Sequence, residues 1–199
     1  AGATVRPGGI SVGRLGGIPT MFGQTTPPEL FEKTCWYACR TKSRAEKKVQ
    51  QQLSGAGFEA YLPVVEEKRQ WADRKKTVAF PLFPGYLFAR FCLTELHEVL
   101  GLPGVASVLR PNGYPTPVRD DDLASLRRFV EGVKETGALP SPCDFLERGR
   151  DVVVVSGPFE GMRGVMVEER GRARVVVRIG VLRRATSVQL DRVVLKLAG

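Results

Sequence analysis

The sequence predicts an α+β protein of two domains, an α/β sandwich followed by a small β-barrel of five strands. Residues 34–136 alternate between strand-like and helix-like apolar patterns, which is typical of a layered α/β domain. Residues 137–147 interrupt these patterns with prolines and predict a linker. Residues 148–199 contain only short runs rich in valine, which favour strands. A chain of 199 residues is long enough for two such domains.

The N-terminal segment differs in composition from the rest of the chain. Residues 1–33 hold seven glycines and four prolines and show no sustained apolar period. Such a segment buries too little apolar surface to offset the entropy lost on ordering. We therefore predict a disordered tail over residues 1–33.

The first domain is predicted to have its elements in the order βαββαβα. Its strands are expected at 36–40, 58–67, 86–92 and 105–109, with a further strand at 77–80, and its helices near 43, 96 and 120. The polar stretch 66–76 is interpreted as a β-hairpin or a loop. This order fits an α/β sandwich of ferredoxin-like type.

Two of the predicted helices have recognisable start signals. Ser43 and Glu46 have the spacing of a capping box, in which a hydroxyl and a carboxylate satisfy free amide groups. Val49 and Leu53 then fall on one face of that helix. Residues 120–122 are three aspartates, and acids are favoured at a helix N-terminus by the backbone dipole.

The second domain is predicted to be entirely β. Its five apolar runs, separated by glycine, proline or charged turns, are 152–155, 165–167, 175–179, 188–190 and 193–197. Short strands of this kind would expose their edges in an open sheet. A small closed barrel is therefore expected.

The charge and the few metal-ligating residues narrow the function. The net charge of +9, spread over both predicted domains, suits a polyanionic partner, although a solvated basic surface explains it equally well. Four cysteines and the lone His97 suggest neither a metal site nor a cofactor, and no residues suggest a catalytic site, so we expect no enzyme. Without an apolar membrane span or secretory core, the protein is expected in the cytoplasm.

Motifs in both domains resemble one family. Residues 152–165 resemble the KOW motif, an apolar strand followed by glycines at 157, 161 and 164. The first domain resembles the NusG N-terminal domain through four motifs in family order: Trp36-Tyr37, Tyr61-Leu62-Pro63, Pro81-Leu82-Phe83-Pro84-Gly85-Tyr86-Leu87-Phe88 and Leu102-Pro103-Gly104-Val105. Residues 184–191 are similar to the last strands of the family's SH3-like KOW barrel.

The resemblance implies a bacterial transcription elongation factor that catalyses no reaction. Its first domain would dock on the clamp helices of the largest catalytic subunit of RNA polymerase, promote processive elongation and touch the non-template DNA strand. The KOW domain would bind Rho or a small-subunit ribosomal protein. Residues 69–76, ahead of Pro81-Leu82-Phe83-Pro84, look closer to the RfaH-like and polysaccharide-operon paralogues, which act as antiterminators. A monomer within the nucleoid-associated transcription complex is expected.

Three groups of residues are candidate binding sites. The first, the aromatic patch, is expected to be exposed and to bind polymerase, since rings give large contact areas, unless they fill the core; it comprises Tyr61, Phe83, Pro84, Tyr86 and Phe88. The second suits a phosphate backbone and an unstacked base, unless it is a solvated hairpin tip and helix face; it comprises Lys42, Arg44, Trp71, Arg74, Lys75 and Lys76. The third, the loop tip of the KOW domain, comprises Val181, Leu182, Arg183 and Arg184.

Two details leave alternatives open. Leu182 occupies the place where the family presents an aromatic residue, and single exposed leucines are common on surfaces. A KOW-containing RNA-binding or ribosome-associated protein would also explain the basic charge.

Overall fold

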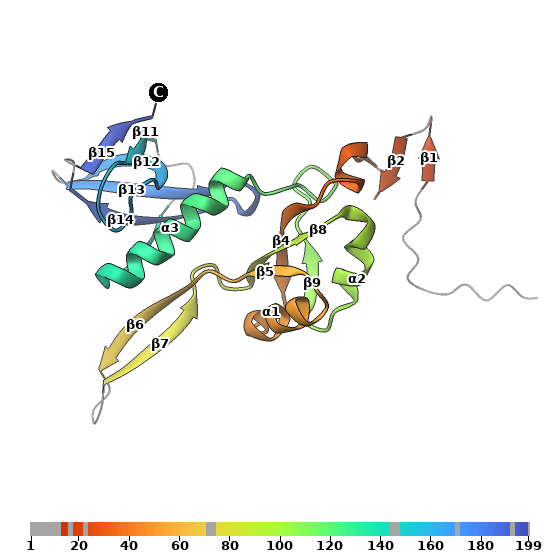
Figure 1. Ribbon diagram of the computed structural model, residues 1–199, viewed down its shortest axis with the longest axis horizontal. Coiled ribbons are helices and arrows are strands. Elements are labelled where there is room, and N and C mark those ends of the chain that lie inside the picture. Colours follow the sequence, from red (N-terminus) through yellow and green to blue (C-terminus); the bar gives the residue numbers. More distant parts are fainter. Residues whose placement is uncertain are drawn as a thin grey trace, which may run out of the picture.

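The computed structural model describes residues 13–15, 18–21, 24–70, 75–143, 148–169, 172–191 and 194–198 (Figure 1). The predicted first domain contains a four-stranded antiparallel sheet in the order β5-β8-β4-β9. These strands are β4 (Cys35–Thr41), β5 (Glu59–Tyr61), β8 (Tyr86–Phe91) and β9 (Val105–Val108). The helices are α1 (Glu46–Gly55), α2 (Leu96–Gly101), which follows η2 (Leu93–Glu95), and α3 (Asp120–Thr136).

Residues on the strands alternate between the two faces of this sheet. Tyr37 and Cys39 of β4 lie in one buried cluster with Val49 and Leu53 of α1 and with Leu96 of α2. The alternate residues of β4 pack in another cluster with α3: Trp36, Ala38, Leu123 and Leu126. Helices α1 and α2 therefore cover one face, and α3 covers the other.

The predicted capping box does not form. Helix α1 begins at Glu46 after Ala45, with no side-chain cap. The Glu46 carboxylate is buried and instead accepts a hydrogen bond from the backbone N–H of Gly85, at 2.7 Å. Gly85 lies in a turn with φ of 83°, immediately before β8. The Glu46 carboxylate therefore makes a long-range contact instead of the helix cap that local spacing predicted.

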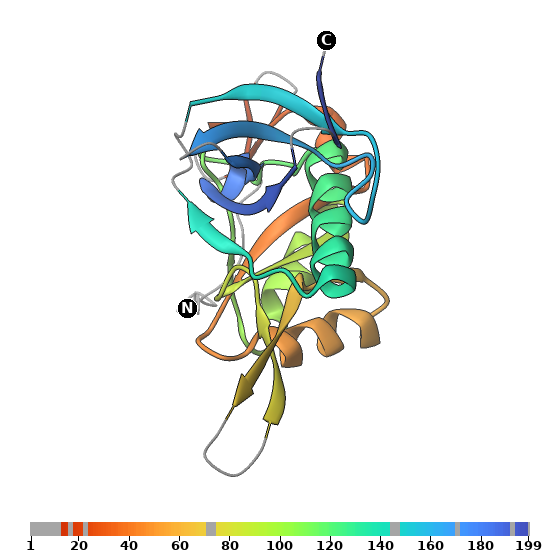
Figure 2. The same ribbon diagram turned by 90° about the vertical axis from the view of Figure 1, so that its left-hand side faces the viewer.

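The polar stretch forms a two-stranded hairpin of β6 (Val64–Gln70) and β7 (Lys75–Pro81), paired from Val64 with Pro81 to Gln70 with Lys75. The strand predicted over 58–67 is divided into β5 and β6 at Leu62 and Pro63. The proline has no N–H for a ladder bond. Figure 2 shows the hairpin projecting from the body of the molecule.

The prediction of disorder over residues 1–33 is wrong where the structure describes them. Short elements occur there: β1 (Gly13–Leu15), β2 (Ile18–Met21), β3 (Gln24–Thr25) and η1 (Pro28–Phe31). The buried side chain of Leu30 joins the core cluster of α1 and α2. The Cys92 thiol donates a hydrogen bond to the carbonyl of Phe31. These contacts offset the ordering entropy that composition alone predicted to dominate, while residues 1–12 lie outside the described part.

The second domain places a strand at each of the five predicted runs. These strands are β11 (Arg150–Val154), β12 (Arg163–Glu169), β13 (Arg172–Ile179), β14 (Arg184–Leu190) and β15 (Leu195–Leu197). The predicted linker adds β10 (Ser141–Cys143), which pairs with β14. The described ladder runs β10-β14-β13-β12-β11-β15 without pairing its two outer strands, so closure of the barrel stays a prediction.

The Glu46 contact fixes the turn that enters β8 and predicts a stability effect. Glu46→Ala leaves the N–H of Gly85 without its acceptor and should lower the free energy of unfolding by about 1.5–3 kcal/mol, the range for hydrogen bonds to charged groups. Urea denaturation followed by circular dichroism measures this loss. Lys47→Ala, an exposed change on the same helix, should stay within about 0.5 kcal/mol of the parent. Equal effects of the two substitutions would contradict the assignment.

Candidate functional site

Helix α3 packs against both domains. Leu123 and Leu126 pack on the sheet of the first domain, whereas Phe129 and Val133 lie in a buried cluster with residues of the second domain. Figures 1 and 2 show the helix running alongside the sheet of the second domain. We call this packing of the second domain against α3 the closed arrangement. A molecule without this packing is called open.

The tightest contact in the closed arrangement joins Gly132 to Phe159. A Cβ atom at position 132 would lie 2.4 Å from Cδ1 of the Phe159 ring, so only glycine leaves room for the ring there. Phe159 is 4% exposed, and its ring centroid lies 6.4 Å from that of Phe129. Sequence analysis missed Gly132, although a glycine inside a helix often has a packing reason of this kind and could have indicated the contact.

Two hydrogen bonds hold the turn that carries Phe159. The hydroxyl of Ser125 accepts a bond from the backbone N–H of Arg163, at 3.2 Å. The Arg128 guanidinium donates to the carbonyl of Gly161. Both partners on the second domain are backbone groups, so these two hydrogen bonds depend on the path of the turn and not on its side chains.

A cavity of about 510 Å³ lies beside these contacts. Its lining includes Asp121 and Asp122 from α3 and Arg163 and Arg178 from the second domain. Burial raises the pKa of Asp122 above its ordinary value, and a backbone hydrogen bond from Gly180 opposes this shift. Two of the acids predicted to stabilise the start of α3 therefore line the same cavity as basic side chains of the other domain.

The aromatic patch is covered in the closed arrangement. Phe83 is 3% exposed and Phe88 is 0% exposed, while Tyr61 and Tyr86 are half-buried and Pro84 is exposed. The second domain contributes to this burial, because its Ile179 and Leu182 belong to the same cluster as Phe83 and Phe88. The expectation of exposure is wrong for Phe83 and Phe88 in this arrangement. The alternation of side chains along a strand shows which of them share a face but not what covers that face.

The covering residues come from the loop tip predicted to bind a partner. Leu182, in η3 (Gly180–Leu182), is 8% exposed, and Val181 is half-buried. Arg184 places its guanidinium carbon 5.3 Å from the ring centroid of Tyr86, and Arg183 is exposed. The two surfaces that the sequence assigned to different partners thus contact each other.

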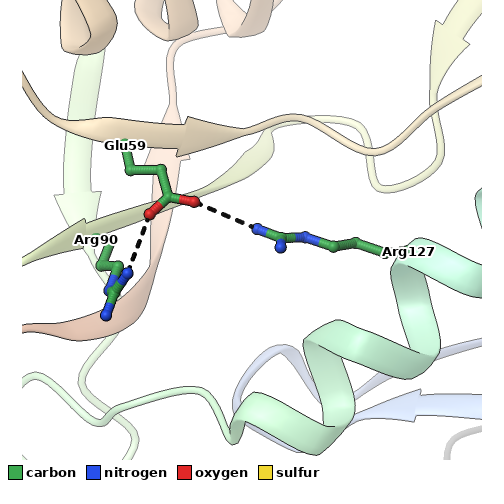
Figure 3. A network of polar contacts seen from close by, with 3 residues as sticks. All are labelled: Glu59, Arg90 and Arg127. Atoms are coloured by element: carbon green, nitrogen blue, oxygen red, sulfur yellow. Dashed lines mark hydrogen bonds and ion pairs between the residues drawn. The ribbon is translucent and has the colours of Figure 1, made fainter.

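An arginine that sequence reasoning missed holds α3 against β5 (Figure 3). The guanidinium carbon of Arg127 lies 5.2 Å from the ring centroids of both Trp36 and Tyr61. The Glu59 carboxylate lies 3.6 Å from Arg127 and 3.2 Å from Arg90. Burial raises the pKa of Tyr61 to about 12, so its hydroxyl stays protonated at neutral pH. These residues are distant in sequence, and no local pattern connects them.

The candidate nucleic-acid residues lie on two separate elements. Lys42 and Arg44 are exposed in the loop between β4 and α1. Lys75 and Lys76 lie in β7, whereas Trp71 and Arg74 fall outside the described residues.

The structure also bears on metal sites, membrane spans and thiol chemistry. Within the described residues, no group of three or more His, Cys, Asp or Glu side chains could hold a metal ion. No helix in the described part of the chain is long and apolar enough to cross a membrane. Burial raises the pKa of the Cys39 thiol to about 12, which keeps it protonated.

Comparison with known proteins gives matches in both domains. Residues 34–127 match the family model described as transcription termination factor nusG. The transcription termination/antitermination protein NusG of Thermus thermophilus is 30% identical over 177 residues, which cover 78% of this chain and 94% of that protein. The chain belongs to the NusG family. The NusG protein of Helicobacter pylori (strain J99) is 24% identical over 168 residues, which cover 78% of this chain and 93% of that protein.

The names of the family model and of these relatives describe transcription termination or antitermination factors. The likeness extends past the end of the family model into the second domain, because 78% of the chain, about 155 residues, is more than the 147 residues that precede that domain. A solved structure described as domain interaction in Thermotoga maritima NusG matches with a TM-score of 0.46 and 27% identity, covering 84% of this chain and 99% of that chain.

The Gly132 contact predicts that a larger side chain opens the closed arrangement. Gly132→Gln should displace the Phe159 ring at a cost of about 1–3 kcal/mol, the usual range for overpacking, and so reduce the ratio of closed to open molecules by about 5- to 150-fold. Small-angle X-ray scattering should report a larger radius of gyration. Gly55→Gln is the matched control, because a Cβ atom at position 55 meets nothing within 4 Å. An unchanged radius of gyration in Gly132→Gln would contradict the packing of the Phe159 ring against Gly132.

Proposed function

We propose that this chain is a bacterial transcription elongation factor that binds RNA polymerase through its first domain and recruits a second protein through its KOW domain. The observation that carries the proposal is the contact between the aromatic patch and the loop tip 181–184. Each surface buries the apolar or aromatic side chains of the other, as expected of surfaces that bind protein partners. Membership in the NusG family supports a role in transcription.

We infer the domain division that this function needs. Residues 34–136 form the polymerase-binding domain, 137–147 the linker and 148–199 the KOW domain. The order β9-β4-β8-β5, which is 4-1-3-2 when the hairpin is left out, supports a ferredoxin-like arrangement for the first. The glycine-containing turn between β11 and β12, with φ of 85° at Gly157 and 76° at Gly161, supports an SH3-like KOW barrel for the second.

Polymerase docking requires the closed arrangement to open. The clamp helices of the polymerase and the loop tip would use the same rings, Phe83 and Tyr86, so the two compete. The apparent affinity for polymerase is then reduced by the fraction of molecules that are open. Docking in turn frees Leu182 and Arg184 to bind Rho or a small-subunit ribosomal protein.

The basic residues of the hairpin and of the β4–α1 loop complete the proposal. Lys42 and Arg44 would approach the phosphate backbone of the upstream DNA, together with Lys75 and Lys76 of the hairpin. Trp71 and Arg74, which lie outside the described residues, would contact an unstacked base of the non-template strand. The motif at 69–76 favours a specialised antiterminator of the RfaH-like or polysaccharide-operon type.

Capture of core RNA polymerase by the full-length protein tests the proposal. Gly132→Gln should capture more polymerase than the parent, and Tyr86→Ala in that background should reduce capture by about 10-fold or more, the scale of an aromatic anchor. Tyr114→Ala, which truncates a half-buried tyrosine packed against the cluster of α1 and α2, is the control. Phe88→Ala would be a poor test, because Phe88 is fully buried and its loss would cost about 3–5 kcal/mol of stability.

The outcomes separate the proposal from its rival. No capture by the parent or by Gly132→Gln, combined with salt-sensitive binding of RNA, would favour a KOW-containing RNA-binding protein. Capture that survives Tyr86→Ala would reject the aromatic patch. Transcription on a template with a terminator, with and without Rho, then distinguishes antitermination from termination by the amount of read-through.

A further inference from the structure

We propose that the β6–β7 hairpin and the second domain are coupled through one shared apolar cluster, so that opening of the closed arrangement and loosening of the hairpin are a single event. The inference rests on the proposed function only for its biological meaning, since that function assigns the hairpin to nucleic acid. The coupling itself follows from side-chain packing.

The base of the hairpin belongs to a buried cluster that also contains residues of α3 and of the second domain. Val65 of β6 is 2% exposed and belongs to the shared cluster, together with Phe129 and Val133 of α3 and Phe159 and Met162 of the second domain. The neighbouring half-buried side chains that pack against this cluster include Phe80 and Leu82. One apolar cluster therefore contains the hairpin base, the shared helix and the second domain.

Val64 and Val65 face different clusters. Val64 packs against the core of α1 and α2, whereas Val65 packs in the shared cluster, because successive residues of a strand point to opposite faces. The base is closed by the pair Val65 and Phe80 and by a hydrogen bond from the N–H of Leu82 to the carbonyl of Pro63, at 2.8 Å. The hairpin is thus held at its base from two sides.

Beyond the base, the described residues of the hairpin include exposed ones. Glu66 and Thr77 are exposed, and Figure 2 shows the strands leaving the body of the molecule. A two-stranded hairpin is only marginally stable in water unless it packs on something else. When the second domain departs, Val65 loses Phe159 and Met162 as cluster neighbours, so one of the two supports is lost.

The coupling acts in both directions. If the open arrangement loosens the hairpin, then a ligand that binds the displaced hairpin preferentially also favours the open arrangement. The free energy of coupling is the same in both directions. Engagement of the hairpin by a nucleic-acid strand would then help to uncover the aromatic patch. The hairpin becomes a regulator of the polymerase-binding surface rather than an independent arm.

Hydrogen–deuterium exchange of the full-length protein tests the coupling in the first direction. In Gly132→Gln, amides of the hairpin base, residues 64–67 and 78–80, should exchange at least about tenfold faster than in the parent, while β4 and β8 keep their protection. Gly55→Gln should leave the hairpin unchanged. Parental protection of the hairpin in a Gly132→Gln protein that scattering shows to be open would overturn the proposal.

Substitutions at the hairpin base test the reverse direction. Val65→Ala should open the closed arrangement and speed the exchange of the turn amides at Glu160 and Gly161 by about tenfold. Val64→Ala removes the same two methyl groups one position earlier, on the side of α1, and should leave that turn protected. Equal effects of the two substitutions, with β4 and β8 intact in both, would reject the shared cluster. Polymerase is absent from both experiments, so their results do not depend on whether the proposed function is correct.

Discussion

The seat of the Phe159 ring on α3, directly over Gly132, is the contact on which the relation between the two domains depends. It brings the turn of residues 157–162 onto the helix, where Arg128 binds the carbonyl of Gly161. With the turn in this place, η3 reaches the first domain and Leu182 joins the cluster of Phe83. The glycine at position 132 therefore leaves room for the Phe159 ring in the arrangement in which the loop tip covers the aromatic patch.

Helix α3 allows this because its apolar stripe is divided along its length between the two domains. Its first half packs on the sheet through Leu123 and Leu126, and its second half packs on the other domain through Phe129 and Val133. The contact between the domains is mixed, with an apolar cluster at one side and a cavity of arginines and aspartates at the other. Interfaces between domains of this mixed character resemble transient protein interfaces and can separate.

Local patterns predicted most of the elements and fewer of the contacts. The five valine-rich runs each contain a strand, and the acids at 120–122 mark the start of α3, because period and capping are properties of short segments. The capping box at Ser43 failed, since Gly85, far along the chain, binds the Glu46 carboxylate. The linker gained β10 because the edge of β14 accepts a strand there.

For the candidate sites as well, local patterns predicted the residues but not the contacts between them. The sequence predicted that the aromatic patch and the loop tip each bind a protein, but not that they would cover each other. No sequence pattern indicated the role of Arg127. It lies on α3 near both Trp36 and Tyr61, and these partners come from two distant strands. Contacts between segments far apart in sequence depend on the whole fold, whereas composition and spacing report only what is adjacent.

The most direct test of this account is a nuclear Overhauser measurement on the full-length protein in solution. The closed arrangement predicts cross-peaks between the Hα protons of Gly132 and the ring protons of Phe159, because a Cβ atom in place of one Hα would lie 2.4 Å from that ring. Observation of these cross-peaks would establish that the second domain sits on α3. Their absence, with separate tumbling of the two domains, would contradict the account.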